Sequence, residues 1–405
     1  MAIKGPLSGV RVLDLTHAYA GPMAGQHLAD MGAEVIKIEP PIGELARMDF
    51  LPGGGPTQVC AGRNKKGIVL DLWTDSGKQA FYDLVRVSDV VLDNYRGAET
   101  TRKMGIDYDT LKEINPRIIC ASLSGYGATG PYSNYPSYDA MAMAISGMVS
   151  LTGGYPAGKP LMPNPGTGDC IGGLMTAIGI VTALYEREGT GVGRKVQVNI
   201  LDACMALLQR EFQYYFFFEQ FPPRQGSISL SVHPLGFYRC QDGYIALGSC
   251  WPQICKAIGK EWMADDPRFR DLESRILHRK ELEDLLEEGL QQAGVEEWLK
   301  RLQAEGIPCS PVNTYSTALE DPQVIHNKAE THMEHLAYGT VRSMAFPVRI
   351  TGAIEGEDVP PPTLGEHTDE VLKTILGYPE DKIARLNKEQ EENFEEMQKH
   401  VRKQF

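Results

Sequence analysis

The feature that most constrains the fold is a regular alternation of short apolar segments with helix-like segments along the first half of the chain. The apolar segments are rich in Val, Ile and Leu and have the length of buried strands. One of the intervening segments, Asp75–Val87, is preceded by Thr74, a residue type that caps helices. We predict strands at Gly9–Leu15, Glu34–Glu39, Ile68–Leu72, Asp89–Asp93, Arg117–Leu123 and Lys195–Asn199. This alternation predicts an α/β fold with a mainly parallel sheet covered by helices on both faces.

Residues that follow the predicted strands are the first candidates for function, because ligands of such sheets bind beyond the carboxyl ends of the strands. They include His17 after the first strand, Asn94 after the fourth and Tyr126 after the fifth. The connection after the first strand contains Ala20–Gly25 and lacks the G-x-G-x-x-G spacing of a dinucleotide-binding turn. A nicotinamide or flavin dehydrogenase is therefore disfavoured.

A glycine-rich stretch, Gly166–Gly173, joins a loop rich in Pro and Gly to an apolar run, Leu174–Tyr185, that is typical of a buried helix. Asp169 lies where this helix is expected to begin. A carboxylate there can cap backbone N–H groups and meets the positive end of the helix dipole, so we expect it to be ionised even when partly buried. Two interpretations follow: a structural N-cap, or a carboxylate nucleophile left accessible by its glycine neighbours.

Changes in character along the 405 residues predict two domains. Residues 131–168, rich in Gly, Pro, Ser, Met and Tyr, predict an irregular excursion. A helix over Asp202–Phe218 is aromatic on every face, so we expect it to be buried, to lie against another chain or to line an aromatic pocket. We expect a large domain at 1–200 and a linker at 201–224 that includes Pro222 and Pro223. A smaller α+β domain follows at 225–325 and begins with a hairpin over Phe237–Leu247. Residues 326–405 are expected to return to the large domain, with strands at Val341–Met344 and Val348–Ile350 and two terminal helices.

Composition limits the partners and the compartment. A formal net charge of −13 argues against nucleic acid or an anionic membrane as a partner, since both require a positive field. Eight scattered cysteines without a C-x-x-C pair indicate reduced thiols rather than a disulfide framework or a zinc site. No basic and apolar leader precedes the first strand, and the run from Ile171 to Tyr185 is shorter than a membrane span. We therefore expect a cytoplasmic protein without a metal, in which a local basic cluster meets any anionic ligand.

Segments spread over nearly the whole chain resemble the class III (family III) CoA-transferases, the group that includes formyl-CoA and carnitine CoA-transferases and relatives acting on benzylsuccinate. No single segment would be sufficient, but the set occurs in the order found in that family. The segments are Pro6–Asp14, Ala20–Pro22, Gly32–Glu39, Gly168–Gly173, Trp251–Cys255, Gly306–Val312 and Leu364–Thr368.

The resemblance implies that Asp169 is the nucleophile. Its carboxylate would attack an acyl-CoA thioester to give an aspartyl anhydride and CoA thiolate, and exchange through an aspartyl-CoA thioester would release the acceptor acid as its own CoA thioester. Coenzyme A is then a substrate, and no cofactor is bound permanently. Covalent catalysis of this kind retains the energy of the thioester in the anhydride. Backbone N–H groups around Gly168 and Gly172, or groups of the opposing chain, would stabilise the oxyanion.

The resemblance also implies binding positions. His17 corresponds to a histidine near the thiol end of CoA and Tyr126 to a tyrosine of the substrate pocket, whereas Tyr19 replaces a glutamine of the formyl-CoA enzymes. The CoA-binding stretch of the family corresponds to Asn94, Arg102, Met104 and Gly105, with Arg102 and Lys103 competing for a phosphate. A basic cluster for the phosphates is available in Lys37, Arg63, Lys65, Lys66, Arg96, Arg102 and Lys103.

For the fold, the resemblance implies a Rossmann-like large domain, a smaller α+β domain and an interlocked dimer, either a homodimer or a heterodimer with a homologous subunit. The glycine loop that shields the site from water in some relatives is replaced here by Ser231–Gly236, so the segment that closes the site is not identified. From Tyr19 and the aromatic run at 212–221 we expect succinyl-CoA as the donor and a bulky or aromatic succinate, such as benzylsuccinate, as the acceptor.

Two alternatives remain. An α-methylacyl-CoA racemase shares the fold and the aspartate, but pairs it with the histidine of a Gly-His-Asp stretch, where this chain has Ser137-Tyr138-Asp139. A tyrosine, with a pKa of about 10, is a poor substitute for that histidine. A non-catalytic subunit of a heteromeric transferase is the second alternative, and the intact Asp169 with its glycines counts against it.

Overall fold

The computed structural model describes residues 3–48, 55–154, 158–164, 166–219, 224–229 and 232–402. The chain divides into two compact units. The larger contains Met1–Met148, Pro163–Phe212 and Asn327–Phe405, and the smaller contains Val149–Met162 and Gln213–His326. Pro222 and Pro223 of the expected linker, and Ser231 of the expected site-closing segment, lie outside the described residues.

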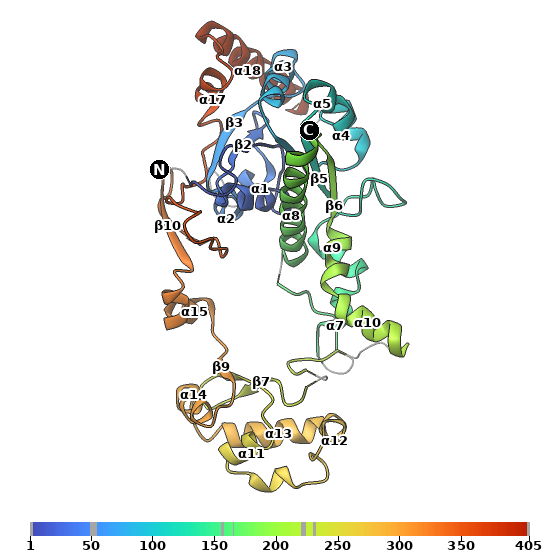
Figure 1. The fold of residues 1–405 in the computed structure, drawn as a ribbon, viewed down its shortest axis with the longest axis vertical. Helices are drawn as coiled ribbons and strands as arrows, with labels where there is room; N and C mark the ends of the chain where they lie inside the picture. Colours follow the sequence, from blue (N-terminus) through green and yellow to red (C-terminus); the bar gives the residue numbers. More distant parts are fainter. Residues whose placement is uncertain are drawn as a thin grey trace. The chain divides into compact units, whose positions relative to one another are not determined.

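A six-stranded sheet in the order β3-β2-β1-β4-β5-β6 forms the centre of the larger unit (Figure 1). All neighbouring strands are parallel, which confirms the predicted architecture. Successive strands extend to one side of β1 and then, from β4, to the other, so the order reverses between β1 and β4. Ligands of such sheets bind at this reversal. The strands are β1 Arg11–Asp14, β2 Glu34–Glu39, β3 Lys65–Val69, β4 Val90–Asp93, β5 Ile119–Ser124 and β6 Lys195–Asn199.

Helices cover both faces of this sheet. On one face α1 (Ala20–Asp30) and α8 (Thr167–Thr190) pack on Val12, Val90 and Ile119 in a single apolar cluster. On the other face the apolar cluster contains side chains from α3 (Asp75–Arg86), α5 (Tyr108–Ile114), α17 (Thr368–Thr374) and α18 (Glu380–Arg402). The carboxyl-terminal helices therefore complete the core that the first strands begin.

Several elements differ from the sequence-based predictions. The segment 131–168, expected to be irregular, contains α6 (Asp139–Ile145) and α7 (Met148–Leu151). Helices α2 (Pro56–Gly62) and α4 (Ala98–Met104) and the 3-10 turn Leu45–Met48 were not predicted. Val348–Ile350 is not a strand; the hairpin in this region pairs β10 (Glu330–His335) with β11 (Gly339–Met344).

The predicted aromatic helix is two helices, α9 (Ile200–Leu207) and α10 (Gln209–Phe218). No residue of α10 is buried, and Phe217 is 79% exposed. Burial within this chain, one of the three expectations for this run, is therefore wrong. Packing against another chain stays a prediction.

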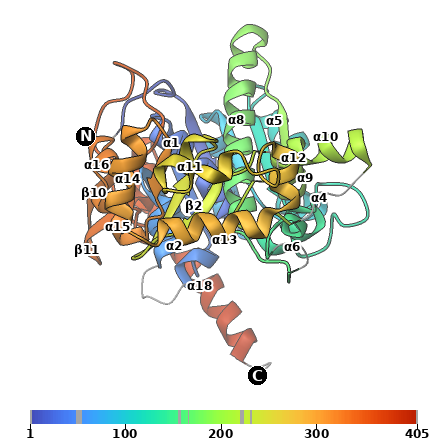
Figure 2. The same ribbon diagram turned by 90° about the horizontal axis from the view of Figure 1, so that it is seen from below.

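The smaller unit is α+β. Its sheet is antiparallel in the order β7-β8-β9, with β7 at Gly236–Arg239, β8 at Tyr244–Leu247 and β9 at Cys309–Pro311. Figure 2 shows the helices that accompany it, and the core contains the buried Tyr238, Leu286 and Trp298. These helices are α11 (Gln253–Ala257), α12 (Leu272–Leu277), α13 (Arg279–Leu290), α14 (Val295–Ala304), α15 (Tyr315–Glu320) and α16 (Pro322–His326).

Helix α8 is longer than its apolar run predicted. With 24 residues it is, among the described residues, the one helix long and apolar enough to cross a membrane. Its buried side includes Thr176, Ala177 and Ile180, which face the sheet and α1. In this fold it is a core helix of the larger unit.

Candidate active site

The first turn of α8 carries Asp169 and is capped from a different helix. Asp139, the first residue of α6, accepts the N–H of Gly166 at Oδ2 over 2.9 Å and the N–H of Asp169 at Oδ1 over 3.0 Å. Gly166, at φ 86°, adopts the left-handed conformation and offers no side chain to the helix. Asp139 is therefore the capping group. The interpretation of Asp169 as the N-cap is wrong, and its own carboxylate is left for another role.

The carboxyl group of Asp169 has an altered affinity for protons. The side chain is partly buried, and this burial, followed by the negative charge of Asp139, raises its pKa to about 7. The expectation that the helix start keeps Asp169 fully ionised is therefore wrong near neutral pH. The ionised form is more basic than an ordinary carboxylate, which favours its action as a nucleophile.

The glycines around Asp169 are required by packing. A Cβ atom on Gly168 would lie 2.7 Å from Asp139 Oδ1 and 3.0 Å from Cys204 Sγ, and one on Gly173 would lie 2.8 Å from the carbonyl oxygen of Ala20. Gly172 lies in the second turn, where the backbone N–H is used inside the helix, whereas Gly168 lies in the first turn. Of these two predicted oxyanion donors, Gly168 alone stays a candidate.

Tyr19, in the connection between β1 and α1, lies beside the start of α8. Its ring packs on Gly166, where an added Cβ would come within 2.9 Å of Tyr19 Cε1, and its hydroxyl lies 3.6 Å from Cys170 Sγ. Burial, the contact with Cys170 and neighbouring charges that include Asp169 raise the pKa of the phenol. Tyr19 is consequently a protonated donor next to Asp169.

His17 and Asn94 meet at the reversal between β1 and β4. The backbone N–H of His17 donates to Asn94 Oδ1 over 2.9 Å, and Asn94 Nδ2 donates to the carbonyl oxygen of His17 over 2.8 Å. Both ends of the Asn94 amide therefore hold the loop rather than reach for a ligand. Burial and then the charge of Lys37 lower the pKa of His17, so its imidazole is neutral at pH 7.

Three members of the predicted basic cluster, Lys37, Arg63 and Lys65, are buried in the larger unit. Lys37 and Lys65 are buried, with their ammonium groups 3.8 Å and 2.8 Å from the carboxylate of Asp14. Arg63 is buried in an ion pair with Asp30 at 2.7 Å. Burial alone would raise the pKa of Asp14, but the charges of Lys37 and Lys65 outweigh it and the pKa is lowered. The prediction that Lys37 binds CoA is therefore corrected: Lys37 is buried beside Asp14 and stabilises the fold.

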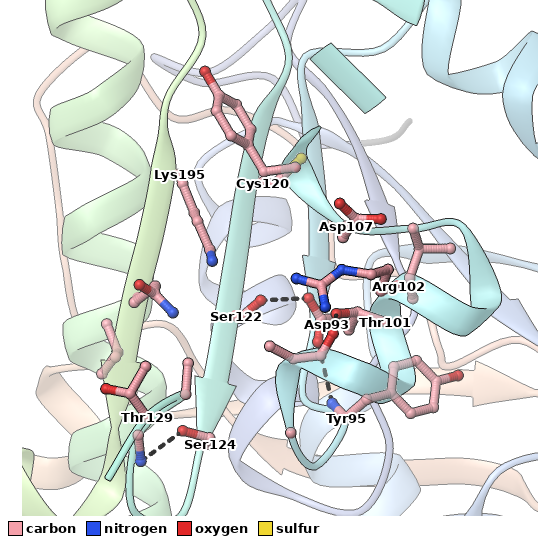
Figure 3. Close-up of a pocket in the computed structure, with 18 of the residues that line it drawn as sticks. Asp93, Tyr95, Thr101, Arg102, Asp107, Cys120, Ser122, Ser124, Thr129 and Lys195 are labelled. Atoms are coloured by element: carbon pink, nitrogen blue, oxygen red, sulfur yellow. Dashed lines mark hydrogen bonds between the residues drawn. The ribbon is translucent and has the colours of Figure 1, made fainter. Parts of the chain in front are cut away.

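Arg102 of α4 projects into a polar pocket on the sheet face opposite α8 (Figure 3). The pocket has a volume of about 260 Å³ and extends along β5 and β6 beside the end of β4. Lys195 points into the same space, and Asp93 forms part of its floor, accepting the hydroxyl of Ser122 over 2.5 Å. Burial raises the pKa of Asp93 to about 6. Arg102 and Lys195 make no ion pair within the described part of the chain, and they share the pocket with the carboxyl groups of Asp93, Asp107 and Asp109.

The other members of the predicted CoA-binding stretch are placed differently. Lys103 is exposed and pairs with Glu99 at 2.8 Å, and Met104 is buried in the core. Tyr126 is half-buried at the end of β5, with its ring edge-on to Tyr132 at 5.8 Å between centroids. Arg102 is consequently the better placed of the two competing cations.

Comparison with known proteins agrees with this parallel sheet. The chain matches CoA-transferase family III over residues 7–368 and belongs to that family. It is a CoA-transferase.

The relatives cover nearly the whole chain. The succinyl-CoA:glutarate CoA-transferase of Homo sapiens is 33% identical over 389 residues, which are 94% of this chain and 88% of the relative. The formyl-CoA:oxalate CoA-transferase of Streptomyces avermitilis is 31% identical over 94% of this chain and 98% of its own. The crystal structure of a CAIB/BAIF family protein from Brucella suis superposes with a TM-score of 0.83 at 30% identity, covering 91% of this chain and 98% of that protein.

Sequence reasoning missed the role of Asp139. The residue was considered only as part of Ser137-Tyr138-Asp139, where a racemase has its histidine. In the structure Tyr138 is 73% exposed and the Asp139 carboxylate caps α8. The signal was present in the lack of a capping side chain at Gly166, which requires a partner from elsewhere.

Proposed function

We propose that this CoA-transferase moves CoA from succinyl-CoA to a dicarboxylic acid through covalent intermediates on Asp169. The observation that carries the proposal is a partly buried carboxylate with a raised pKa in a glycine-flanked helix start, next to a protonated tyrosine. The donor follows from the human relative, which is named for succinyl-CoA and glutarate.

In the proposed first half, an oxygen of Asp169 attacks the thioester carbonyl carbon of the donor. The carbon–sulfur bond breaks, and CoA leaves as a thiolate while an aspartyl anhydride remains. The thiolate then attacks the aspartyl carbonyl, which releases succinate and leaves an aspartyl-CoA thioester. We assign Tyr19 Oη and the N–H of Gly168 as the donors to the oxyanion that forms at each attack.

In the second half, the acceptor carboxylate attacks the aspartyl-CoA thioester and again releases the thiolate. The thiolate attacks the acceptor carbonyl of the new anhydride, so the acceptor leaves as a CoA thioester and Asp169 is restored as a carboxylate. No atom is oxidised or reduced and no proton is consumed, so the chain needs no further cofactor for this route.

For binding, we propose that Arg102 contacts a phosphate of CoA and that the neutral imidazole of His17 lies near the thiol. Arg102 has the geometry for a bidentate phosphate contact and is not paired within the described residues. For the acceptor, the exposure of α10 leaves Tyr19 as the support for an aromatic substituent. Benzylsuccinate is therefore tested beside glutarate.

A mass-spectrometric assay tests the proposal. The protein is mixed with succinyl-CoA and, in parallel, with glutarate, citramalate, oxalate or benzylsuccinate, and new CoA thioesters are identified by mass. Asp169→Ala should abolish transfer without unfolding the protein, and hydroxylamine should inactivate the wild type only when an acyl-CoA is present. Full activity of Asp169→Ala would contradict the mechanism.

We further propose that two copies interlock in the cytoplasm, without a nucleic-acid or membrane partner. Support comes from exposed apolar side chains on α8, among them Leu174, Met175 and Ile178, and from the aromatic α10. Activity of the purified chain alone would favour a homodimer, and activity that appears only after a homologous chain is added would favour a heterodimer or the non-catalytic role.

A further inference from the structure

The connection between β1 and α1 holds His17 and Tyr19 on either side of a residue in an unusual conformation. Ala18 has φ 63°, in the left-handed region that residues with a Cβ rarely adopt. The side chain of Ala18 is exposed, so its own packing does not hold this conformation. Some other contact must hold it.

Its neighbours are held by the strands and by the loop after β4. The N–H of Thr16 donates to Asp14 Oδ1 over 3.0 Å, and Lys37 Nζ donates to the carbonyl oxygen of Thr16. His17 is held by its two hydrogen bonds with Asn94, one donated by each residue. These contacts end one residue before Ala18.

Ala18 is held by a carboxylate from the segment after β2. Its N–H donates to Glu44 Oε2 over 2.9 Å, and the same oxygen accepts the N–H of Ala46 over 2.8 Å. Glu44 is 8% exposed, and its own N–H donates to Glu39 Oε2 over 3.2 Å. Glu39 also accepts two hydrogen bonds of 2.6 Å from Arg47. The oxygen that holds Ala18 is thus fixed by a buried ionic network.

We infer that Glu44 is a positioning residue of the active site, because its carboxylate holds Ala18 in the left-handed conformation and so directs His17 and Tyr19 to their places. Its influence on Asp169 rests on the function proposed above, whereas its influence on the loop does not. Tyr19 is the part of the loop nearest to the nucleophile, since it packs on Gly166 and Cys170. Loss of the Glu44 contact lets Ala18 relax and withdraws Tyr19 from Cys170.

Three substitutions of Glu44 separate the effect of side-chain length from the effect of charge. Glu44→Asp keeps the carboxylate but is one methylene too short to accept from both Ala18 and Ala46. Glu44→Gln keeps the length and one carbonyl oxygen in place of Oε2, so it should retain both contacts. Glu44→Ala removes the acceptor. Thr74→Ala is the matched control, because Thr74 Oγ1 likewise accepts a backbone N–H, that of Gly77 at 3.1 Å, at the start of α3.

Two measurements are made on the full-length protein. The first is the rate constant for acylation of Asp169 by succinyl-CoA in a single turnover, quenched and read by mass. The second does not depend on activity: it is the rate at which iodoacetamide alkylates Cys170, with Cys309 of the smaller unit as the internal reference. Thermal unfolding of each variant accompanies both.

We expect Glu44→Asp and Glu44→Ala to lower the acylation rate by about tenfold or more. We expect the same variants to raise the alkylation of Cys170 by about threefold or more, because Tyr19 no longer covers it. Glu44→Gln and Thr74→Ala should stay close to the wild type in both measurements. If Glu44→Ala does not fold, the results for Glu44→Asp alone test the positioning role of Glu44.

If Cys170 is alkylated in Glu44→Asp at the wild-type rate, the inference is overturned. It is also overturned if Thr74→Ala, at the same thermal stability, changes the acylation rate and the alkylation rate as much as the Glu44 variants do. A wild-type protein that forms no acyl intermediate would instead refute the proposed function. The alkylation measurement would still decide the role of Glu44 in that case.

Discussion

The raised pKa of Asp169 predicts that this residue destabilises the folded protein above neutral pH. Its pKa is about 7 in the folded protein, whereas an ordinary aspartate has a pKa of 3.8. Between these values the folded state binds more protons than the unfolded state, so the free energy of unfolding falls as pH rises from about 4 to 7. Below that interval the penalty is absent, and above it the penalty is complete.

The magnitude follows from the size of the shift. A rise of about three pKa units corresponds to about 4 kcal/mol, and partial solvent access to Asp169 reduces this to about 2 kcal/mol. Asp169→Asn keeps the backbone N–H that Asp139 accepts but cannot ionise. This variant should therefore be more stable than the wild type by about 2 kcal/mol at pH 8, and by roughly a third of that at pH 5.

Hydrogen exchange in urea, read by mass spectrometry on peptides from α8 and β5, measures the stability of the larger unit separately from the smaller one. Asp75→Asn is the control, because Asp75 is an exposed carboxylate in the first turn of α3 and its replacement brings no such gain. A difference between Asp169→Asn and the wild type that is the same at pH 5 and pH 8 would refute the reasoning. A variant less stable than the wild type at pH 8 would refute it as well.

Further predictions concern the rate, the CoA site and the core. The rate of acylation should rise with pH to a plateau above about 7, and Asp139→Asn should move this rise to lower pH because it removes a negative charge beside Asp169. In steady-state kinetics, Arg102→Ala should raise the KM for the CoA donor about tenfold with little change in kcat, whereas Lys103→Ala should leave both nearly unchanged. Lys65→Ala should destabilise the larger unit by about 3–5 kcal/mol in urea unfolding, because it leaves a buried carboxylate without its partner at 2.8 Å.

The strands of the large sheet and their parallel packing could be predicted from the sequence, because buried parallel strands appear as apolar runs with helical stretches between them. The start of β3 could not, since Lys65 is a polar residue that becomes buried through an ion pair formed across the sheet. The start of α8 near Asp169 could be predicted, but its cap could not. Its first turn contains glycines and an aspartate rather than apolar residues, and its cap comes from α6, thirty positions earlier in the chain.

The position of Asp169 could be predicted, but its protonation could not. Helix-start chemistry alone favours the ionised form, and the opposing effects of burial and of Asp139 depend on tertiary structure. The same holds for the lysines and arginines: Lys37 and Arg63 look like surface cations in the sequence, and only the fold shows that they face Asp14 and Asp30.

The cap that α6 provides to α8 connects the chemical state of one residue with the docking of a helix. Asp139 accepts hydrogen bonds from the backbone of α8, and its carboxylate also repels the charge of Asp169. Because that repulsion weakens the contact, α6 is held more tightly against α8 whenever the charge of Asp169 is absent. In the proposed cycle the charge disappears when the anhydride forms and returns when Asp169 is released. Helix α6 would then tighten and loosen once in each turnover, and by reciprocity any ligand that presses α6 inward favours the acylated enzyme.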